Sequence, residues 1–101
     1  GDVYKRQVLV PAHGVYATRV TFENGESRPA VTNIGVRPTV DDGDRVTVEG
    51  FILDFQGDLY GQTVRMEFYK RLRGERKFPS LEALKDEVMR NAEQTRAYFS
   101  T

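Results

Sequence analysis

GVYATRVTFENGESRPAVTNI, residues 14–34, contains two apolar segments on either side of Asn24-Gly25. The first segment, Gly14 to Phe22, is rich in the β-branched and aromatic residues that favour strands. Asn24-Gly25 supplies the positive-φ pair of a tight hairpin turn, so the second segment, about Arg28 to Ile34, is expected to return antiparallel. The sequence therefore predicts an antiparallel sheet that starts with a hairpin.

Two more strands are expected before a single helix. Val46 to Phe55 is apolar on both faces, as expected of a strand buried inside a barrel or under a second layer. Thr63 to Leu72 alternates between apolar and polar residues, the period of a half-buried strand. After Pro79 the period becomes three and four, and Ser80 is a favourable N-cap for a helix. The apolar stripe of this helix comprises Leu81, Leu84, Val88, Ala92, Thr95 and Phe99.

These elements predict a mainly β fold, a small antiparallel Greek-key-type β-barrel with one C-terminal α-helix that covers an opening or a flank. The chain has 101 residues, which is enough for one domain with a modest core. Fifteen basic residues balance fifteen acidic ones, so no net field favours nucleic acid or an anionic membrane. The chain has no cysteine, and no apolar run approaches the roughly 20 residues that span a bilayer. We expect a cytoplasmic protein with neither nucleic acid nor membrane as a partner.

Several short polar sequences lie between the apolar segments: TNIGVRPT (residues 32–39), EGFILDF (49–55), DLYG (58–61) and LRGERKF (72–78). Together and in this order they resemble riboflavin kinase, in particular the C-terminal kinase module of the bacterial bifunctional flavin-nucleotide enzymes. The resemblance extends from Leu9 to Phe99. It implies a phosphotransferase that converts riboflavin and ATP into FMN and ADP with Mg²⁺ as cofactor. In longer relatives, an N-terminal FAD synthetase (adenylyltransferase) domain then converts FMN to FAD.

Glu49 matches the catalytic glutamate of the family. Transfer of a γ-phosphoryl group to the 5′-hydroxyl of riboflavin needs a group that accepts the hydroxyl proton. With Val48, Phe51 and Leu53 nearby, the Glu49 carboxylate is expected to be partly desolvated and therefore more basic. The alternative is a solvated carboxylate on the outer face of an edge strand.

A second candidate site is the turn expected at residues 33–39, which by resemblance lies near the nucleotide. Gly35 lets the backbone approach a ligand closely, and Arg37 offers a planar fork for phosphate. We therefore assign Asn33, Gly35 and Arg37 to ATP binding. The alternative, to which we give equal weight, is a rigid barrel corner fixed by Pro38.

The segment Leu72 to Phe78 resembles the loop that folds over the flavin in the family. An apolar side chain packs on the face of an isoalloxazine ring, and a guanidinium stacks on it or donates hydrogen bonds to its edge. Leu72, Arg73 and Glu75 are the residues assigned to riboflavin. The alternative is a charged surface loop before the helix.

The first seven residues fit neither the strand pattern nor the family, and we interpret residues 1–7 as foreign sequence. Residues 8–101 then form a riboflavin kinase-like domain that lacks the usual first strands. Those strands carry a Pro-Thr-Ala-Asn sequence in the family, whose Thr and Asn help to hold magnesium. That sequence is absent here, so no metal-binding residue is assigned.

Two further functions stay open at this point. One is a catalytically inactive fragment that retains a flavin- or nucleotide-binding surface, which the absence of Pro-Thr-Ala-Asn favours. The other is a barrel adaptor for protein or RNA, against which the neutral charge and the sequences around Glu49 and Arg73 count.

Overall fold

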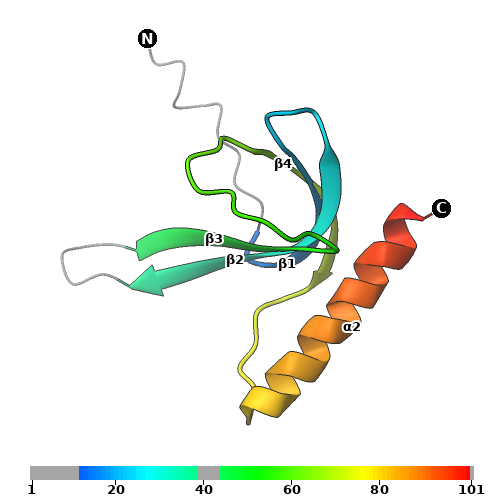
Figure 1. Ribbon diagram of the computed structural model, residues 1–101. Helices are drawn as coiled ribbons and strands as arrows, with labels where there is room; N and C mark the ends of the chain where they lie inside the picture. The colour runs from blue at the N-terminus through cyan, green and yellow to red at the C-terminus, as the bar shows by residue number, and fades with distance from the viewer. Residues whose placement is uncertain (1–11, 39–43, 101) are drawn as a thin grey trace.

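The computed structural model describes residues 12–38 and 44–100, and they form one antiparallel sheet with a long helix at its side (Figure 1). A loop after the last strand leads to the start of this helix. In chain order the elements are β1 (Gly14–Thr21), β2 (Ser27–Pro38), β3 (Asp44–Ile52), β4 (Arg65–Arg73) and α2 (Leu81–Phe99).

The strand order is β3-β2-β1-β4, with every neighbouring pair antiparallel. Three consecutive strands lie side by side, and β4 returns to pair with β1, which is the Greek-key order. The mainly β fold with a C-terminal helix is therefore confirmed. Closure into a barrel is not confirmed, because β3 and β4 are the two edges of an open sheet in the described residues.

The first hairpin is confirmed, although its turn differs from the expected one. β1 and β2 pair from Gly14↔Ile34 to Thr21↔Ser27, which leaves five residues in the connection. Of the described residues other than glycine, Asp54 alone has a positive φ, so Asn24-Gly25 is not a positive-φ pair. Gly25 has φ 93°, and the Asn24 side chain instead accepts a hydrogen bond from the Glu26 amide at 2.9 Å.

The segment expected as a turn from residue 33 onward continues β2 as far as Pro38 and pairs with β3. β-Branched Ile34 and Val36 favour this extended backbone. Thr39 and most of the acidic loop after it lie outside the described residues, as do the side chains of Arg37, Pro38 and Asp44. A Gly-x-Arg-Pro sequence therefore does not mark a corner here, because strand pairing overrides its turn preference.

The prediction that β3 is buried on both faces is wrong. Val46, Val48 and Phe51 are 47%, 51% and 56% exposed. β3 is an edge strand, so in the described structure no strand lies beyond it to cover these side chains. Burial begins only where the chain turns inward, at Leu53, which is fully buried and whose amide donates to the Pro29 carbonyl at 2.9 Å.

The core is made by β1, which is buried on both of its faces from Gly14 to Thr18. On one side, Val15 packs in a cluster with Val31, Leu53 and Ala92, against which Leu72 also packs. On the other side, a second cluster gathers around the end of the first hairpin and contains Val20, Phe22 and Ala30, with Ile52, Phe55, Leu59 and Met66 against it. A central strand between two apolar clusters gives the site below a rigid floor.

Helix α2 begins as predicted. Ser80 has an extended backbone and its hydroxyl accepts a hydrogen bond from the Ala83 amide at 3.0 Å, which satisfies one of the free N–H groups of the first turn. The buried face differs from the predicted stripe. Leu81 is 79% exposed and Leu84 38%, whereas four residues of the helix are buried: Glu87, Asn91, Ala92 and Thr95.

The C-terminal half of α2 is tied to the segment after β3. Arg96 donates two hydrogen bonds to the Asp54 carboxylate, the shorter at 3.1 Å. The hydrogen bonds that Arg96 donates to Asp54, and the negative charge of that carboxylate, raise the pKa of Arg96. No helix within residues 12–38 and 44–100 has the length and apolar character needed to cross a bilayer.

Candidate functional site

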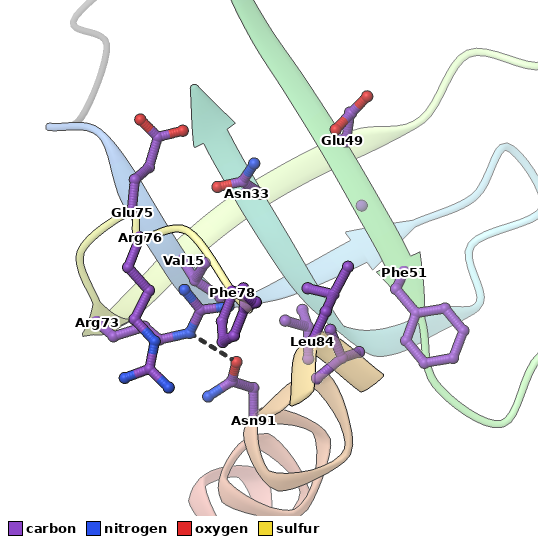
Figure 2. Close-up of a pocket in the computed structure, with 13 residues that line it drawn as sticks. Val15, Asn33, Glu49, Phe51, Arg73, Glu75, Arg76, Phe78, Leu84 and Asn91 are labelled. Atoms are coloured by element: carbon purple, nitrogen blue, oxygen red, sulfur yellow. Dashed lines mark hydrogen bonds between the residues drawn. The ribbon is translucent and has the colours of Figure 1, made fainter. Parts of the chain in front are cut away.

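A cavity of about 420 Å³ opens between the sheet, the loop after β4 and the first half of α2 (Figure 2). Its walls combine apolar and charged side chains from elements far apart in the sequence. β1, β2 and β3 contribute Val15, Val31, Asn33, Glu49, Gly50 and Phe51. β4, the loop and α2 contribute Arg73, Glu75, Arg76, Phe78, Leu84, Val88 and Asn91.

Asn33 and Glu49 are brought together by strand register. They are direct partners on β2 and β3, so their side chains leave the sheet on the same face, and directly opposed Cβ atoms lie about 5 Å apart. Glu49 is exposed, and the partial desolvation expected for it is not found, because β3 is an edge strand. An exposed carboxylate on the cavity wall remains able to accept a proton from a bound hydroxyl group.

Arg73, the last residue of β4, is held by α2. Its Nε donates to Asn91 Oδ1 at 3.0 Å and lies 3.3 Å from Glu87 Oε2. Burial lowers the pKa of Arg73, an effect that the Glu87 charge opposes. The guanidinium nevertheless stays protonated at any physiological pH. It therefore presents a fixed positive charge to the cavity.

Phe78 and Arg76 continue the same wall. The Cζ atoms of Arg73 and Arg76 lie 5.4 Å and 4.7 Å from the centre of the Phe78 ring, within the range of a cation–π contact. Figure 2 shows these three side chains on the loop side of the cavity, with Glu49 on β3 at the other side. A flat ring and two guanidinium groups form a surface suited to an aromatic, polar-edged ligand.

Glu87 is a buried charged side chain beside the cavity that the sequence analysis missed. It is 7% exposed and pairs with Arg73, Arg76 and Arg90. Burial alone would raise its pKa, but the hydrogen bond and charge of Arg90, with the charge of Arg76, hold that pKa below its usual value. One sequence feature could have indicated Glu87: it lies beside the apolar stripe of a helix that follows an arginine-rich loop.

The other predicted residues lie apart from one another. Gly35 does not line the cavity itself, and a Cβ atom built on it would lie 2.5 Å from Oε2 of Glu75, which does. Leu72 does not line the cavity, and packs instead against the core cluster of Val15. Arg37 pairs with Arg45 through the backbone of β2 and β3, and its side chain is outside the described residues.

The described residues contain no group of three or more His, Cys, Asp or Glu side chains that could enclose a metal ion. Mg²⁺ bound with a nucleotide needs only one or two protein oxygens besides phosphates and water. Asn33 and Glu49 offer two side-chain oxygens on one cavity wall. This donor set fits a nucleotide-borne Mg²⁺ and does not fit a resident metal.

The family model and the curated relatives agree in their description. A sequence model of the riboflavin kinase family matches residues 2–99. Bifunctional riboflavin kinase/FMN adenylyltransferases align over nearly the whole chain, with 44% identity in Pseudomonas fluorescens (95% of this chain, 30% of the relative). The Escherichia coli K12 protein is 38% identical (97% and 31%) and the Bacillus subtilis protein 35% (91% and 29%).

A solved structure also matches, described as that of a macrolide-efflux protein from Streptococcus pneumoniae. It superposes with a TM-score of 0.80 at 34% identity, and covers 87% of this chain and 28% of its own. The chain thus spans about three tenths of the length of the curated relatives it matches. Because the family match covers nearly every residue, the chain belongs to the riboflavin kinase family.

Proposed function

We propose that this chain is a kinase module that transfers the γ-phosphoryl group of ATP to the 5′-hydroxyl of riboflavin, giving FMN and ADP. The observation that carries the proposal is the single cavity in which Glu49 and Asn33 face Arg73, Arg76 and Phe78. The carboxylate that accepts a proton and the surface that accepts a flat ring thus belong to one site. Family membership supports the same reaction.

Glu49 acts as the proton acceptor in this proposal. The 5′-oxygen of riboflavin attacks the γ-phosphorus, its proton passes to a Glu49 carboxylate oxygen, and the bond from phosphorus to the β,γ-bridging oxygen breaks. ADP leaves with the electrons of that bond. Because phosphoryl transfer depends chiefly on alignment and charge stabilisation, an exposed carboxylate that aligns the hydroxyl group is sufficient for this role.

The flavin ring occupies the loop side of the cavity. Phe78 and Arg73 offer an aromatic face and a guanidinium, and Phe51, Leu84 and Val88 supply apolar wall. The cavity volume of about 420 Å³ falls in the range of about 300–1,000 Å³ typical of small-molecule sites. Glu75 lies at this side and remains assigned to riboflavin, whereas Leu72 would act through the core beneath the loop.

ATP is assigned to the β2 side, with Asn33, Gly35 and Arg37. Mg²⁺ bound to the nucleotide neutralises charge on the β- and γ-phosphates, and Asn33 is the side chain that would help to hold it. We infer that the module works in the cytoplasm, where ATP is supplied. By analogy with the relatives, it works beside an adenylyltransferase domain that uses its product.

Formation of FMN from riboflavin and Mg-ATP, followed by chromatography, tests the proposal. Glu49→Gln removes the proton acceptor and should lower turnover about 10²–10⁴-fold with little change in riboflavin affinity. Glu67→Gln is the matched control, because Glu67 is an exposed glutamate on β4 that does not line the cavity. If the chain binds riboflavin but forms no FMN, it is the inactive binding fragment; if it does neither, the proposed function is wrong.

A further inference from the structure

One buried carboxylate joins the helix to the cavity loop. Glu87 Oε1 lies 3.0 Å from Arg90 Nη2 and 3.5 Å from Arg76 Nη2, and its Oε2 lies 3.3 Å from Arg73 Nε. Arg90 belongs to the same helix, whereas Arg73 and Arg76 flank the start of the loop after β4. Glu87 itself is not among the residues that line the cavity.

Asn91 adds a second connection one turn further along α2. Its Oδ1 accepts the 3.0 Å hydrogen bond from Arg73 Nε, and its Nδ2 donates to Glu87 Oε2 at 3.4 Å and to Gln94 Oε1 at 3.0 Å. Asn91 therefore accepts the Arg73 Nε–H, while Glu87 forms an ion pair with the same guanidinium. This arrangement fixes the rotation of the Arg73 guanidinium against the Phe78 ring.

The energetics make this connection hard to break. Removing a partner from a buried carboxylate is destabilising. Movement of the loop away from α2 would separate Glu87 from Arg76 and Arg73 and leave it with the partners on its own helix alone, Arg90 and Asn91. The side chain of Arg73 is 16% exposed and that of Arg76 55% exposed, so Glu87 pairs with one partly buried and one accessible charge on the cavity wall.

We propose that Glu87 is a positioning residue that holds the loop of residues 74–78 over the cavity before the ligand arrives. It acts through Arg73 and Arg76, which in turn hold Phe78, and it contacts no ligand itself. The identification of that ligand as riboflavin rests on the proposed function. A preformed wall lowers the ordering cost of binding, so Glu87 sets flavin affinity from outside the cavity.

The test compares Glu87→Gln with Glu93→Gln. Glu93 lies on the same helix and forms an exposed ion pair with Arg96 at 2.9 Å, away from the cavity. In the ligand-free chain, hydrogen exchange of the amides of residues 74–78 should become about tenfold faster in Glu87→Gln only, as expected of a local opening. Riboflavin affinity should fall about tenfold in the same variant, whereas Mg-ADP affinity should stay nearly unchanged.

Coupling to Arg73 distinguishes positioning from general weakening. If Glu87 acts through Arg73 and Arg76, the double variant Glu87→Gln/Arg73→Gln should lose less riboflavin affinity than the sum of the two single losses. Additive losses would overturn the proposal, as would unchanged loop exchange in Glu87→Gln. Should that variant fail to fold, Arg76→Gln removes a loop partner from an accessible position and should also accelerate loop exchange; unchanged exchange there would likewise overturn it.

The loop-exchange result is independent of the ligand. If the wild-type chain fails to bind riboflavin while loop exchange responds as expected, the proposed function is wrong and the structural role of Glu87 stands. If riboflavin binds equally well to wild type and Glu87→Gln, riboflavin is a ligand of the chain and the positioning role is wrong.

Discussion

Gly35 and Glu75 lie against each other although forty residues separate them. A Cβ atom built on Gly35 would approach Glu75 Oε2 to 2.5 Å, closer than side-chain atoms pack. The strand assigned to ATP therefore touches the loop assigned to riboflavin. Asn33, which is assigned to ATP, and Arg73, which is assigned to riboflavin, line the same cavity. The two proposed binding regions therefore adjoin each other.

Gly35→Ala should displace the Glu75 side chain and weaken riboflavin binding several-fold. The chain should still fold with almost unchanged stability, because the atom in the way is the end of a flexible side chain and Gly35 has no positive φ. In a Glu75→Ala background the same substitution should have no further effect on affinity. Riboflavin titrations of the four proteins check this. An equal loss in both backgrounds would show that Gly35 acts independently of Glu75.

Arg73→Ala should weaken riboflavin binding by about 1–2 kcal/mol, for one lost stacking or charged contact, and leave ADP binding nearly intact. Arg37→Ala should do the reverse. Calorimetry with each ligand against each variant gives the answer, with thermal unfolding as the control, because Arg73→Ala also removes a partner of buried Glu87. If both substitutions weakened both ligands equally, the assignment to two walls would be wrong.

Thr95→Val should stabilise the chain by about 1 kcal/mol. The Thr95 hydroxyl is fully buried and has no hydrogen-bond partner among the described residues, so its replacement by a methyl group removes a desolvated polar atom without changing shape. Thr18→Val is the matched control. The Thr18 hydroxyl donates to the Ala30 carbonyl at 3.1 Å and pairs with Thr32 Oγ1 at 2.7 Å, so its removal should destabilise. Urea unfolding measures the change in the free energy of unfolding for both variants. Changes of the same sign would contradict this prediction.

Local signals in the sequence predicted the elements well. The first hairpin, the alternating β4 and the Ser80 N-cap depend on residues close in the chain, and all three are confirmed. The exposure of β3 could not be predicted, because an apolar strand has the same sequence pattern at the edge of a sheet as at its centre. Only the strand order shows that Val48 has no neighbour beyond it in the described sheet.

The candidate site shows the same division. Asn33, Glu49, Arg73 and Glu75 were selected from their sequences and all line the cavity. Glu87 was missed because a charged helix residue normally faces solvent, and what buries it is a pair of arginines before the helix. Pairing between residues on different elements produces no periodic pattern in the sequence.

Acid should destabilise the chain through Glu87. Burial would raise the pKa of Glu87, but the hydrogen bond and charge of Arg90 hold that pKa below its usual value. A carboxylate whose folded pKa is depressed contributes stability that is present above the unfolded pKa of about 4.3 and is lost as pH falls through the lower folded pKa. Urea unfolding of wild type and Glu87→Gln should therefore show a constant difference in stability near neutral pH that shrinks below about pH 5. Glu93→Gln, the control, should follow the wild-type curve, and a difference for Glu87→Gln that stayed constant down to pH 3 would show that its charge does not stabilise the fold.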